Sequence, residues 1–272
     1  MKRKITLWMS AAATAFGLSA TTVQSEGGSF TPPQYSNFLS FGIGVVPDYI
    51  GSDDNFIGAA PFGIFGLGEN RFVSIVANSA YVNVSKDKNF RFGPTATYRF
   101  GRDDDVDDSV VSLMEEIDDT VELGAFAGYM MELSDDIRDR ATFGGQIAFD
   151  VGGVHNGYAA SINARRWFPV GKFGVLGLGA AVTYGSGDYM DTYFSVSPVD
   201  AATTGLPQYK AGDGLRDARV MALFIHPITK NWVAGGGVYY SRILGDAADS
   251  PIVEDRGKKD QLIYGLGIGY VW

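Results

Sequence analysis

The last twelve residues, Gln261–Trp272 with the sequence QLIYGLGIGYVW, decide the fold of this chain. Successive side chains of a β-strand point to opposite faces, so this stretch divides into two sets. One set is mostly glycine, and the other is large and apolar, with Leu262, Tyr264, Leu266, Ile268, Tyr270 and Trp272. A soluble sandwich would show polar residues on its outward face, whereas a membrane barrel turns bulky apolar residues to lipid and small residues to its lumen. The stretch therefore predicts the closing strand of a membrane β-barrel, with Tyr270 and Trp272 as its C-terminal assembly signature.

The composition agrees with one large β domain rather than two smaller ones. The chain has 272 residues, of which 36 are glycine and 13% are aromatic, and it has no cysteine. Without cysteine it has neither a disulfide framework nor a thiolate site. The mean hydropathy of +0.01 is typical of strands whose lipid-facing and lumen-facing residues alternate. The formal net charge of −9 argues against nucleic acid as a partner.

The N-terminus has the pattern of a secretory signal peptide. Lys2, Arg3 and Lys4 precede a short apolar run over residues 5–16, and small residues follow it. The apolar run is too short for a transmembrane helix, which needs about 20 residues. We therefore predict a signal peptide over residues 1–25, cleaved after Ala20 or Ser25, and a barrel over residues 26–272.

Segments of period two recur along the chain between turn residues, which predicts an all-β fold: a single antiparallel transmembrane β-barrel of about twelve strands. An even number of strands is compatible with periplasmic N- and C-termini. The predicted strands cover residues 37–46, 56–65, 71–84, 90–101, 121–133, 142–151, 158–168, 173–184, 192–196, 218–228, 232–244 and 261–272. This register directs the loops near Ser52, Lys86, Asp135, Lys172, Leu206 and Asp249 outward, and the turns near Glu69, Asp104, Asn156, Gly187 and Thr229 to the periplasm. A soluble sandwich is the alternative, but the leader, the alternation and the aromatic terminus agree on a barrel.

Several stretches resemble the MipA/OmpV family of outer-membrane proteins, also called the MltA-interacting protein family. They cover residues 46–55, 119–130, 153–158, 192–199 and 241–258, the last with the specific segment DAADSP, and the terminal strand fits as well. The resemblance implies a barrel in the outer membrane of a Gram-negative cell. It also implies the best-known role of the family, a scaffold that links a lytic transglycosylase to a murein synthase. A shared fold fixes location better than activity.

Six charged residues alternate with apolar ones in the predicted strands and are expected to line the lumen: Arg91, Arg99, Glu122, Glu132, Asp150 and Arg165. Buried charges need partners, so these residues can form an ion-paired plug. They can instead line a water-filled passage. A barrel of about twelve strands lies between small barrels filled by side chains and large open porins, so we expect a filled or narrow lumen.

The acidic segment from Arg102 to Thr120 contains an apolar stripe at helical spacing, formed by Val110, Val111, Leu113, Met114 and Ile117. An amphipathic helix on the periplasmic side could dock with these residues onto a barrel mouth or a periplasmic protein. A solvated acidic turn that covers the barrel is the alternative interpretation.

The chain has only two histidines, His155 in the turn 152–157 and His226 before Pro227. A lipid-hydrolysing barrel needs a serine, a histidine and an orienting polar group within hydrogen-bond reach. Ser161 is the nearest serine, but we expect it deep in the lumen while His155 lies at the rim. Neither histidine has a second histidine or a cysteine beside it to hold a metal. We therefore predict no catalytic residue, no cofactor and no metal site.

The charged residues of the loop 246–259 allow two interpretations. Arg256, Lys258 and Lys259 can contact lipopolysaccharide phosphates, or they can pair with the neighbouring carboxylates in a salt-bridged rim.

Three functions are compatible with the sequence. The first is a non-enzymatic scaffold for peptidoglycan-remodelling enzymes, which rests on the resemblance. The second is a narrow passive pore whose conductance changes with Arg91, Arg99 or Glu122, and the third is a lipid-modifying barrel enzyme.

Overall fold

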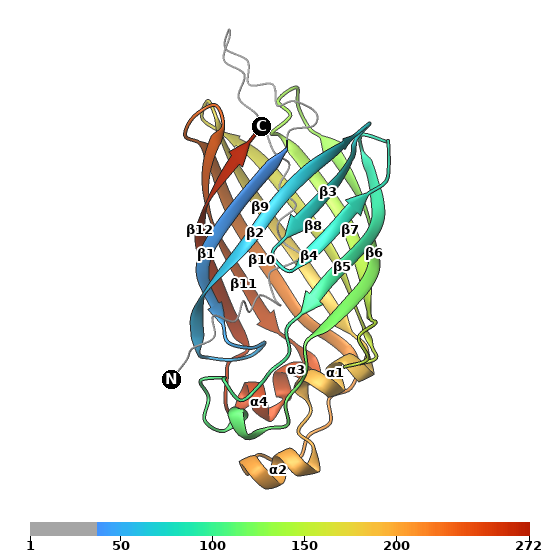
Figure 1. The fold of residues 1–272 in the computed structure, drawn as a ribbon, viewed down its shortest axis with the longest axis vertical. Coiled ribbons are helices and arrows are strands. Elements are labelled where there is room, and N and C mark those ends of the chain that lie inside the picture. The colour runs from blue at the N-terminus through green and yellow to red at the C-terminus, as the bar shows by residue number, and fades with distance from the viewer. Residues whose placement is uncertain (1–36) are drawn as a thin grey trace.

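In the computed structural model, residues 37–272 are described, and they form a closed antiparallel barrel (Figure 1). Each strand pairs with its neighbours in sequence, and the last strand pairs with the first. The strands are β1 (Phe38–Pro47), β2 (Asn55–Gly68), β3 (Arg71–Val76), β4 (Ser79–Asn83), β5 (Phe90–Arg99), β6 (Thr120–Glu132), β7 (Arg140–Asp150), β8 (Tyr158–Val170), β9 (Gly174–Gly185), β10 (Gly214–Pro227), β11 (Trp232–Ile243) and β12 (Asp260–Val271). The predicted all-β barrel of about twelve strands is confirmed. The predicted signal peptide lies outside the described residues.

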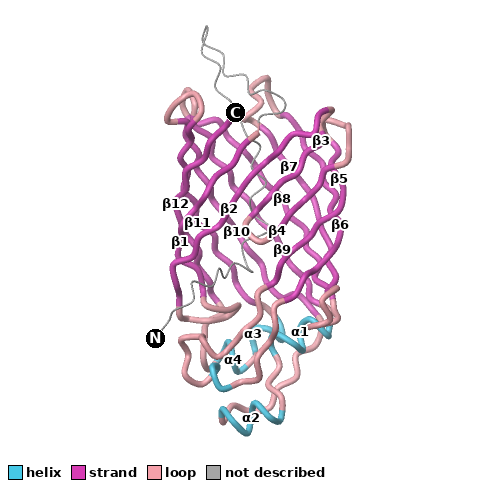
Figure 2. The backbone as a smooth tube through the Cα atoms, in the orientation of Figure 1, coloured by secondary structure: helices cyan, strands magenta, loops and turns pink. Residues whose placement is uncertain are grey.

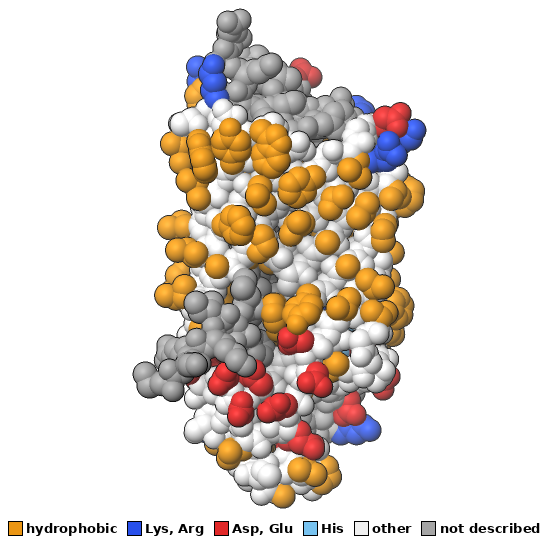
Figure 3. All heavy atoms as spheres, viewed as in Figure 1, with side chains coloured by type: hydrophobic (Ala, Val, Ile, Leu, Met, Phe, Trp, Pro, Cys, Tyr) orange, Lys and Arg blue, Asp and Glu red, His pale blue; other side chains and the backbone are white. Residues whose placement is uncertain are grey.

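The terminal stretch closes the barrel. β12 pairs with β1 from Phe38 opposite Val271 to Val45 opposite Tyr264. The large apolar side chains of β12 are exposed on the outer surface, and the glycines between them face the lumen. Large apolar residues are exposed on other strands around the barrel as well, and Figure 3 shows one face of this hydrophobic belt, which is the surface that lipid requires.

Two errors in the predicted strands cancel in the strand count. Residues 71–84 form the β3–β4 hairpin instead of one strand, with Val76 opposite Ser79 across a tight turn at Ala77 and Asn78. Residues 192–196, predicted as a strand, include the end of the helix α1 (Gly187–Phe194). Ala77 has a φ of 53°, which alanine seldom adopts, so nothing in the alternation marks this turn.

The missed hairpin changes the end of the barrel at which several loops lie. Asn37 donates its backbone N–H to the carbonyl of Trp272 at 3.2 Å, so both ends of the described chain lie together. The turns on that side, which we call the terminal end, are short and cover residues 69–70, 84–89, 133–139, 171–173 and 228–231. The opposite end carries the loops 48–54, 100–119, 151–157, 186–213 and 244–259 and every described helix (Figure 2). Relative to the termini, the predicted sides were therefore wrong near Lys86, Asp104, Asp135, Asn156, Lys172 and Gly187.

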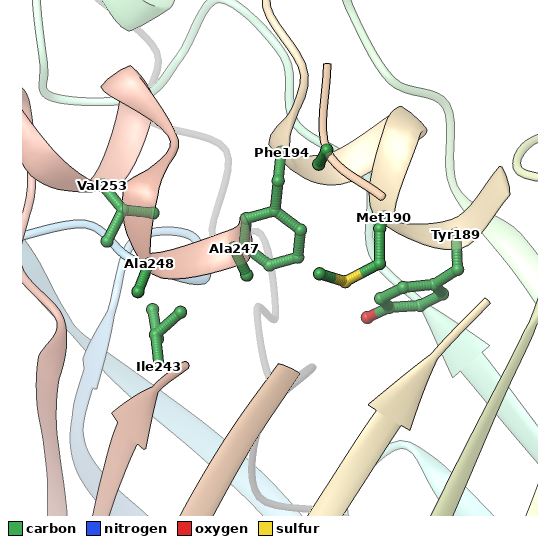
Figure 4. Packing of buried hydrophobic residues seen from close by; sticks show 8 residues of the cluster. Tyr189, Met190, Phe194, Ile243, Ala247, Ala248 and Val253 are labelled. Atoms are coloured by element: carbon green, nitrogen blue, oxygen red, sulfur yellow. The ribbon is translucent and has the colours of Figure 1, made fainter. Parts of the chain in front are cut away.

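The three longest loops, 100–119, 186–213 and 244–259, pack together as a cap over this opposite end. They contain the 3₁₀ turn η1 (Val111–Leu113) and the helices α1, α2 (Pro198–Thr204), α3 (Gly245–Asp249) and α4 (Pro251–Glu254). One apolar cluster joins α1, α3 and α4 to the end of β11 (Figure 4), through Tyr189, Met190, Phe194, Ile243, Ala247, Ala248 and Val253. None of the helices in residues 37–272 is long and apolar enough to cross a membrane.

One stretch of the wall has a strand neighbour on one side only. β2 pairs with β1 from Asn55 to Ile64, but its pairing with β3 begins at Phe62. Within the described chain, residues 55–60 extend past the tip of the β3–β4 hairpin with no strand paired on that side. Membrane barrels normally satisfy all backbone groups by pairing, so this stretch is a local break in the ladder.

Candidate functional site

The lumen has two unlike halves. The residues of β5 to β10 that face inward are largely polar or charged, and five of the predicted lumen residues lie among them: Arg91, Arg99, Glu122, Asp150 and Arg165. The sixth, Glu132, lies at the rim of the terminal end, 3.9 Å from Lys88. The inward residues of β1, β2, β11 and β12 are mostly glycines and aliphatic side chains.

A buried polar network lies where the polar half meets the cap. The Arg99 guanidinium donates to both carboxylate oxygens of Glu122, at 2.5 Å to Oε1 and 2.7 Å to Oε2. The Nε2 atom of His155 lies 2.9 Å from Glu122 Oε1. The Glu122 side chain is only 1% exposed, so this carboxylate depends on its two partners for its charge to be tolerated.

Asp150 fixes the position of His155. Its carboxylate accepts backbone N–H groups of Gly152, His155 and Asn156 at 2.7 to 2.9 Å, and the hydroxyl of Thr120 at 2.5 Å. The turn after β7 therefore folds around one carboxylate, which places the imidazole over the lumen. Asp150 lies on the lumen face opposite Glu122, and its carboxylate holds the turn that positions His155.

The cap contributes an aromatic side chain to this network. Tyr189 of α1 is fully buried, and its ring lies 5.0 Å from the Arg99 guanidinium and 5.1 Å from the His155 ring. The Tyr189 hydroxyl also accepts a hydrogen bond from Arg216 at 2.5 Å. Ser186 begins α1, because its side chain accepts the backbone N–H of Tyr189. Tyr189 therefore lies in the capped first turn of α1, with its side chain in the network.

A second buried network was not predicted from the sequence. Arg216 and Arg219 share the carboxylate of Asp217, with Nε to oxygen distances of 2.6 and 3.0 Å. Arg219 also donates to the hydroxyls of Tyr239, at 3.0 Å, and Thr183. The predicted strand began only at Ala218, so it omitted Asp217. The register shift between Leu215 and Asp217 hides Arg216 from any alternation rule.

Nearer the terminal end the lumen wall is rich in arginine. Arg91 donates to the sulfur of Met130 and lies over the Phe72 ring, and Arg140 donates to the carbonyl of Ile137. The guanidinium groups of Arg140 and Arg165 lie 5.4 and 5.8 Å from the Trp167 ring. Neither Arg91 nor Arg140 makes a salt bridge with a carboxylate of the described chain. Arg140 was missed because the predicted strand began at Thr142.

The surroundings of His155 do not fit a hydrolytic triad. The Nδ1 atom accepts the backbone N–H of Gly157 at 3.1 Å, so the proton belongs on Nε2, which donates to Glu122. No ring nitrogen remains for a serine, and no hydrogen bond joins Ser161 to His155. His226 is exposed on the outer face beside Phe224. Within residues 37–272 there is no group of three or more histidine or acidic residues that could hold a metal ion.

The predicted docking residues lie in the cap, at the opposite end of the barrel from Asn37 and Trp272. Val111 and Met114 are buried in a cluster with Tyr49, Val106, Val196 and Ile252. Leu113 is 56% exposed, and Val110 and Ile117 are half-buried. The expected amphipathic helix is only the turn η1: the Asp108 side chain accepts the N–H groups of Val110 and Val111 at its start, and the backbone becomes extended at Met114, where ψ is 161°. Docking of a partner by these residues stays a prediction, and Leu113 is the exposed residue among them.

Two basic side chains of the loop 244–259 are paired within the cap. Arg256 donates to both oxygens of Asp108, and Lys259 lies between Asp249 and Glu254. Burial alone would raise the pKa of the Asp108 carboxyl, but the N–H of Val111 and the Arg256 guanidinium hold this pKa below its usual value. These contacts favour the salt-bridged rim over contact with lipopolysaccharide phosphates.

A match to a family profile covers almost the whole barrel and its cap. Residues 39–272 match the profile of the MltA-interacting protein MipA. The chain belongs to this family. With the closed barrel and its hydrophobic belt, membership identifies this MipA-family protein as an outer-membrane β-barrel.

Solved barrels resemble the chain only distantly. An outer membrane channel from Pseudomonas putida F1 is 10% identical, with a TM-score of 0.48 over 92% of this chain and 100% of that one. OmpT of Vibrio cholerae is 9% identical, with a TM-score of 0.42 over 88% of this chain and 96% of that one. The NanC porin is 7% identical, with a TM-score of 0.40 over 86% and 98%. No curated protein sequence matches the chain.

Proposed function

We propose that this MipA-family barrel is a non-enzymatic anchor in the outer membrane for peptidoglycan-remodelling enzymes, a lytic transglycosylase and a murein synthase. The observation that carries the proposal is the closure of one barrel end by its own loops. Tyr189, Met190 and Phe194 are fully buried there, so the cap is an internal packing surface. The family name supplies the class of partner.

The docking surface in this proposal is the terminal end, which we take to face the periplasm. Its turns are short and carry exposed charges, among them Lys86 and Lys88, whose side chains are 65% and 64% exposed. Outer-membrane barrels usually have short turns on the periplasmic side and long loops outside. A surface of this kind suits an electrostatically matched and reversible contact with a periplasmic enzyme.

The two other functions have less support. A steady pore would need a passage through the cap, so we expect no stable conductance from the purified barrel in planar bilayers. A lipid-modifying enzyme would need a base, and both ring nitrogens of His155 are already engaged. Steady conductance that changes in an Arg99→Gln or Glu122→Gln variant would instead support the pore.

Photo-crosslinking in cells tests the anchor. A photoreactive residue at Lys88 or Lys172 reports on the terminal end, and one at Leu113 reports on the cap. We expect a transglycosylase or a murein synthase to be captured from the first two positions and not from Leu113. Capture from Leu113 alone would place the docking site in the acidic segment 102–120, and would mean that the cap and not the terminal end faces the periplasm. Silence at all three positions would refute the anchor.

A further inference from the structure

The apolar half of the lumen contains a cavity. Its empty volume is about 840 Å³, including a part open to solvent, and it lies between β1, β2, β10, β11 and β12. Bulky lining side chains include Phe38, Val46, Phe62, Leu223 and Ile225, and glycines make up much of the remaining wall. A concave and mostly apolar lining of this kind is typical of small-molecule sites.

The cavity offers little to water. Its inward polar groups are the hydroxyls of Ser40 and Tyr239. Ser40 donates to the carbonyl of Phe62 at 3.5 Å, and Tyr239 accepts from Arg219 at 3.0 Å. A buried water needs two to four polar partners, so this space suits an apolar occupant better than ordered water.

A smaller pocket with cationic walls adjoins the cavity. It has an empty volume of about 260 Å³ and is lined by Arg165 and Arg219. Tyr239 lines both spaces, which places an apolar chamber and guanidinium groups next to each other. Arg140 is 7% exposed and adds a further guanidinium to the same half of the wall without a salt bridge of its own. Arg219 shares Asp217 with Arg216, so these three groups keep one net positive charge, and together with Arg165 and Arg140 they make a wall that complements an anion.

We propose that the lumen binds a single-chain anionic amphiphile of the long-chain fatty acid type. The alkyl chain occupies the apolar cavity, and the carboxylate faces Arg165 and Arg219, whose planar guanidinium groups suit a carboxylate. This binding site is separate from the proposed anchor and does not depend on it.

In this proposal the ligand enters from the bilayer at the break in the wall. Gly58 and Ala60 line the cavity, and both belong to the part of β2 that has no strand partner on the β3 side. By this route an amphiphile dissolved in lipid would reach the cavity without passing the cap.

Two pairs of neighbouring residues provide matched variants. Ala60 is 2% exposed and points into the cavity, while Ala59 beside it is exposed on the outer face. Ala60→Leu fills the cavity, and Ala59→Leu adds the same carbons outside it. Likewise Arg165→Gln removes a charge from the lumen, and Arg166→Gln removes one that pairs with Asp139 on the outer side.

Energy transfer from Trp167 to a conjugated polyene fatty acid measures the binding. Trp167 packs against Leu223, which lines the cavity. The mature barrel is reconstituted in phosphatidylcholine nanodiscs with Trp232 and Trp272 replaced by phenylalanine, and empty nanodiscs give the background. A heat-dependent shift on gels confirms that each variant is folded.

We expect Ala60→Leu to weaken binding of the acid at least about tenfold, and Ala59→Leu to leave it unchanged. Arg165→Gln should weaken binding of the acid by a similar factor and leave binding of its methyl ester unchanged. Arg166→Gln should change the binding of neither ligand. Equal binding by wild type and Ala60→Leu would overturn the proposal, and so would equal binding of acid and ester. Binding that appears only after deletion of residues 26–36 would show that the N-terminal segment of the chain is the occupant, which also overturns it.

Discussion

Glu122 of β6 connects the neighbouring strand β5 to the turn 151–157, because it accepts hydrogen bonds from Arg99 and from His155. Removing one partner of a buried ion pair leaves the other charge uncompensated, at a cost of about 3–5 kcal/mol. We therefore expect Glu122→Gln to lower the free energy of unfolding by about 3 kcal/mol. Urea unfolding in lipid vesicles, followed by tryptophan fluorescence, measures this loss.

Glu132 is the matched control for Glu122. It lies on the same face of β6, but its side chain is 44% exposed and its partner Lys88 is 3.9 Å away. An exposed ion pair contributes at most about 1 kcal/mol, so Glu132→Gln should change stability little. If Glu122→Gln and Glu132→Gln lower the free energy of unfolding equally, the lumen network does not stabilise the barrel.

Asp108 makes the stability of the cap depend on pH. Its folded pKa is below the usual value, because the N–H of Val111 and the Arg256 guanidinium outweigh the effect of burial. A depressed pKa means that the stabilisation is complete above the unfolded pKa of about 3.9 and is lost as the pH falls through the folded pKa. The cap should therefore loosen only in acid, below about pH 4.

Hydrogen exchange at Val110 and Val111, corrected for the intrinsic effect of pH, tests this dependence. Asp108→Asn keeps an oxygen acceptor but loses the charge, so protection of the two amides should fall on the order of tenfold at pH 6. In wild type, the protection of these amides should fall to that of the variant as the pH falls below about 4. Asp105→Asn, at an exposed neighbouring position, should behave as wild type throughout.

Among single residues, alternation predicted the face of a side chain but not its partner. Arg99 and Glu122 were expected on the inner wall because a two-residue period fixes the face of every residue in a regular strand. The contact with His155 could not be predicted, since the place of that ring depends on a turn folded around Asp150. Arg216 was missed for a different reason: it lies at a bulge, where the period fails.

At the scale of elements, the β3–β4 hairpin was missed because its turn contains neither glycine nor proline. Two-residue hairpins usually use glycine where φ is positive, and here Ala77 takes a φ of 53°. We therefore expect Ala77→Gly to stabilise the barrel by about 0.5–1 kcal/mol, because it relieves this strain. Urea unfolding again measures the effect.

Ala80 provides the control within the same hairpin. It lies in β4 opposite Ile75, where glycine has no conformational advantage. Ala80→Gly should destabilise the barrel by about 0.5–1 kcal/mol. A loss of stability in both variants would mean that the positive φ of Ala77 is not strained.

The acidic segment shows what helical spacing can and cannot predict. Its apolar stripe correctly marked residues that are buried, since Val111 and Met114 lie in the cap. The same spacing did not produce a helix longer than the turn η1, because the backbone becomes extended at Met114, where ψ is 161°. Apolar periodicity thus identified the packing residues but not the length of the helical turn.

For the whole molecule, the two ends of the barrel differ in kind. One end is closed by loops that bury aromatic and aliphatic side chains, and the other has only short turns beside both termini. The predicted number of strands is right only because two errors cancel: the missed hairpin reverses the side of every later loop until the false strand at residues 192–196 restores the order. The orientation of these ends in the membrane determines whether the cap or the turns meet a periplasmic partner.

Single cysteines determine this orientation, because the chain has no cysteine of its own and therefore no background. Ala202 is exposed on α2 in the cap, and Lys88 is exposed in a turn at the terminal end. A maleimide that cannot cross the outer membrane should label Ala202→Cys on intact cells, and should label Lys88→Cys only after that membrane is permeabilised. We expect this result because the cap consists of the long loops that outer-membrane barrels place outside. The opposite pattern would place the cap in the periplasm, where Leu113 and not Lys88 would be available to a murein enzyme.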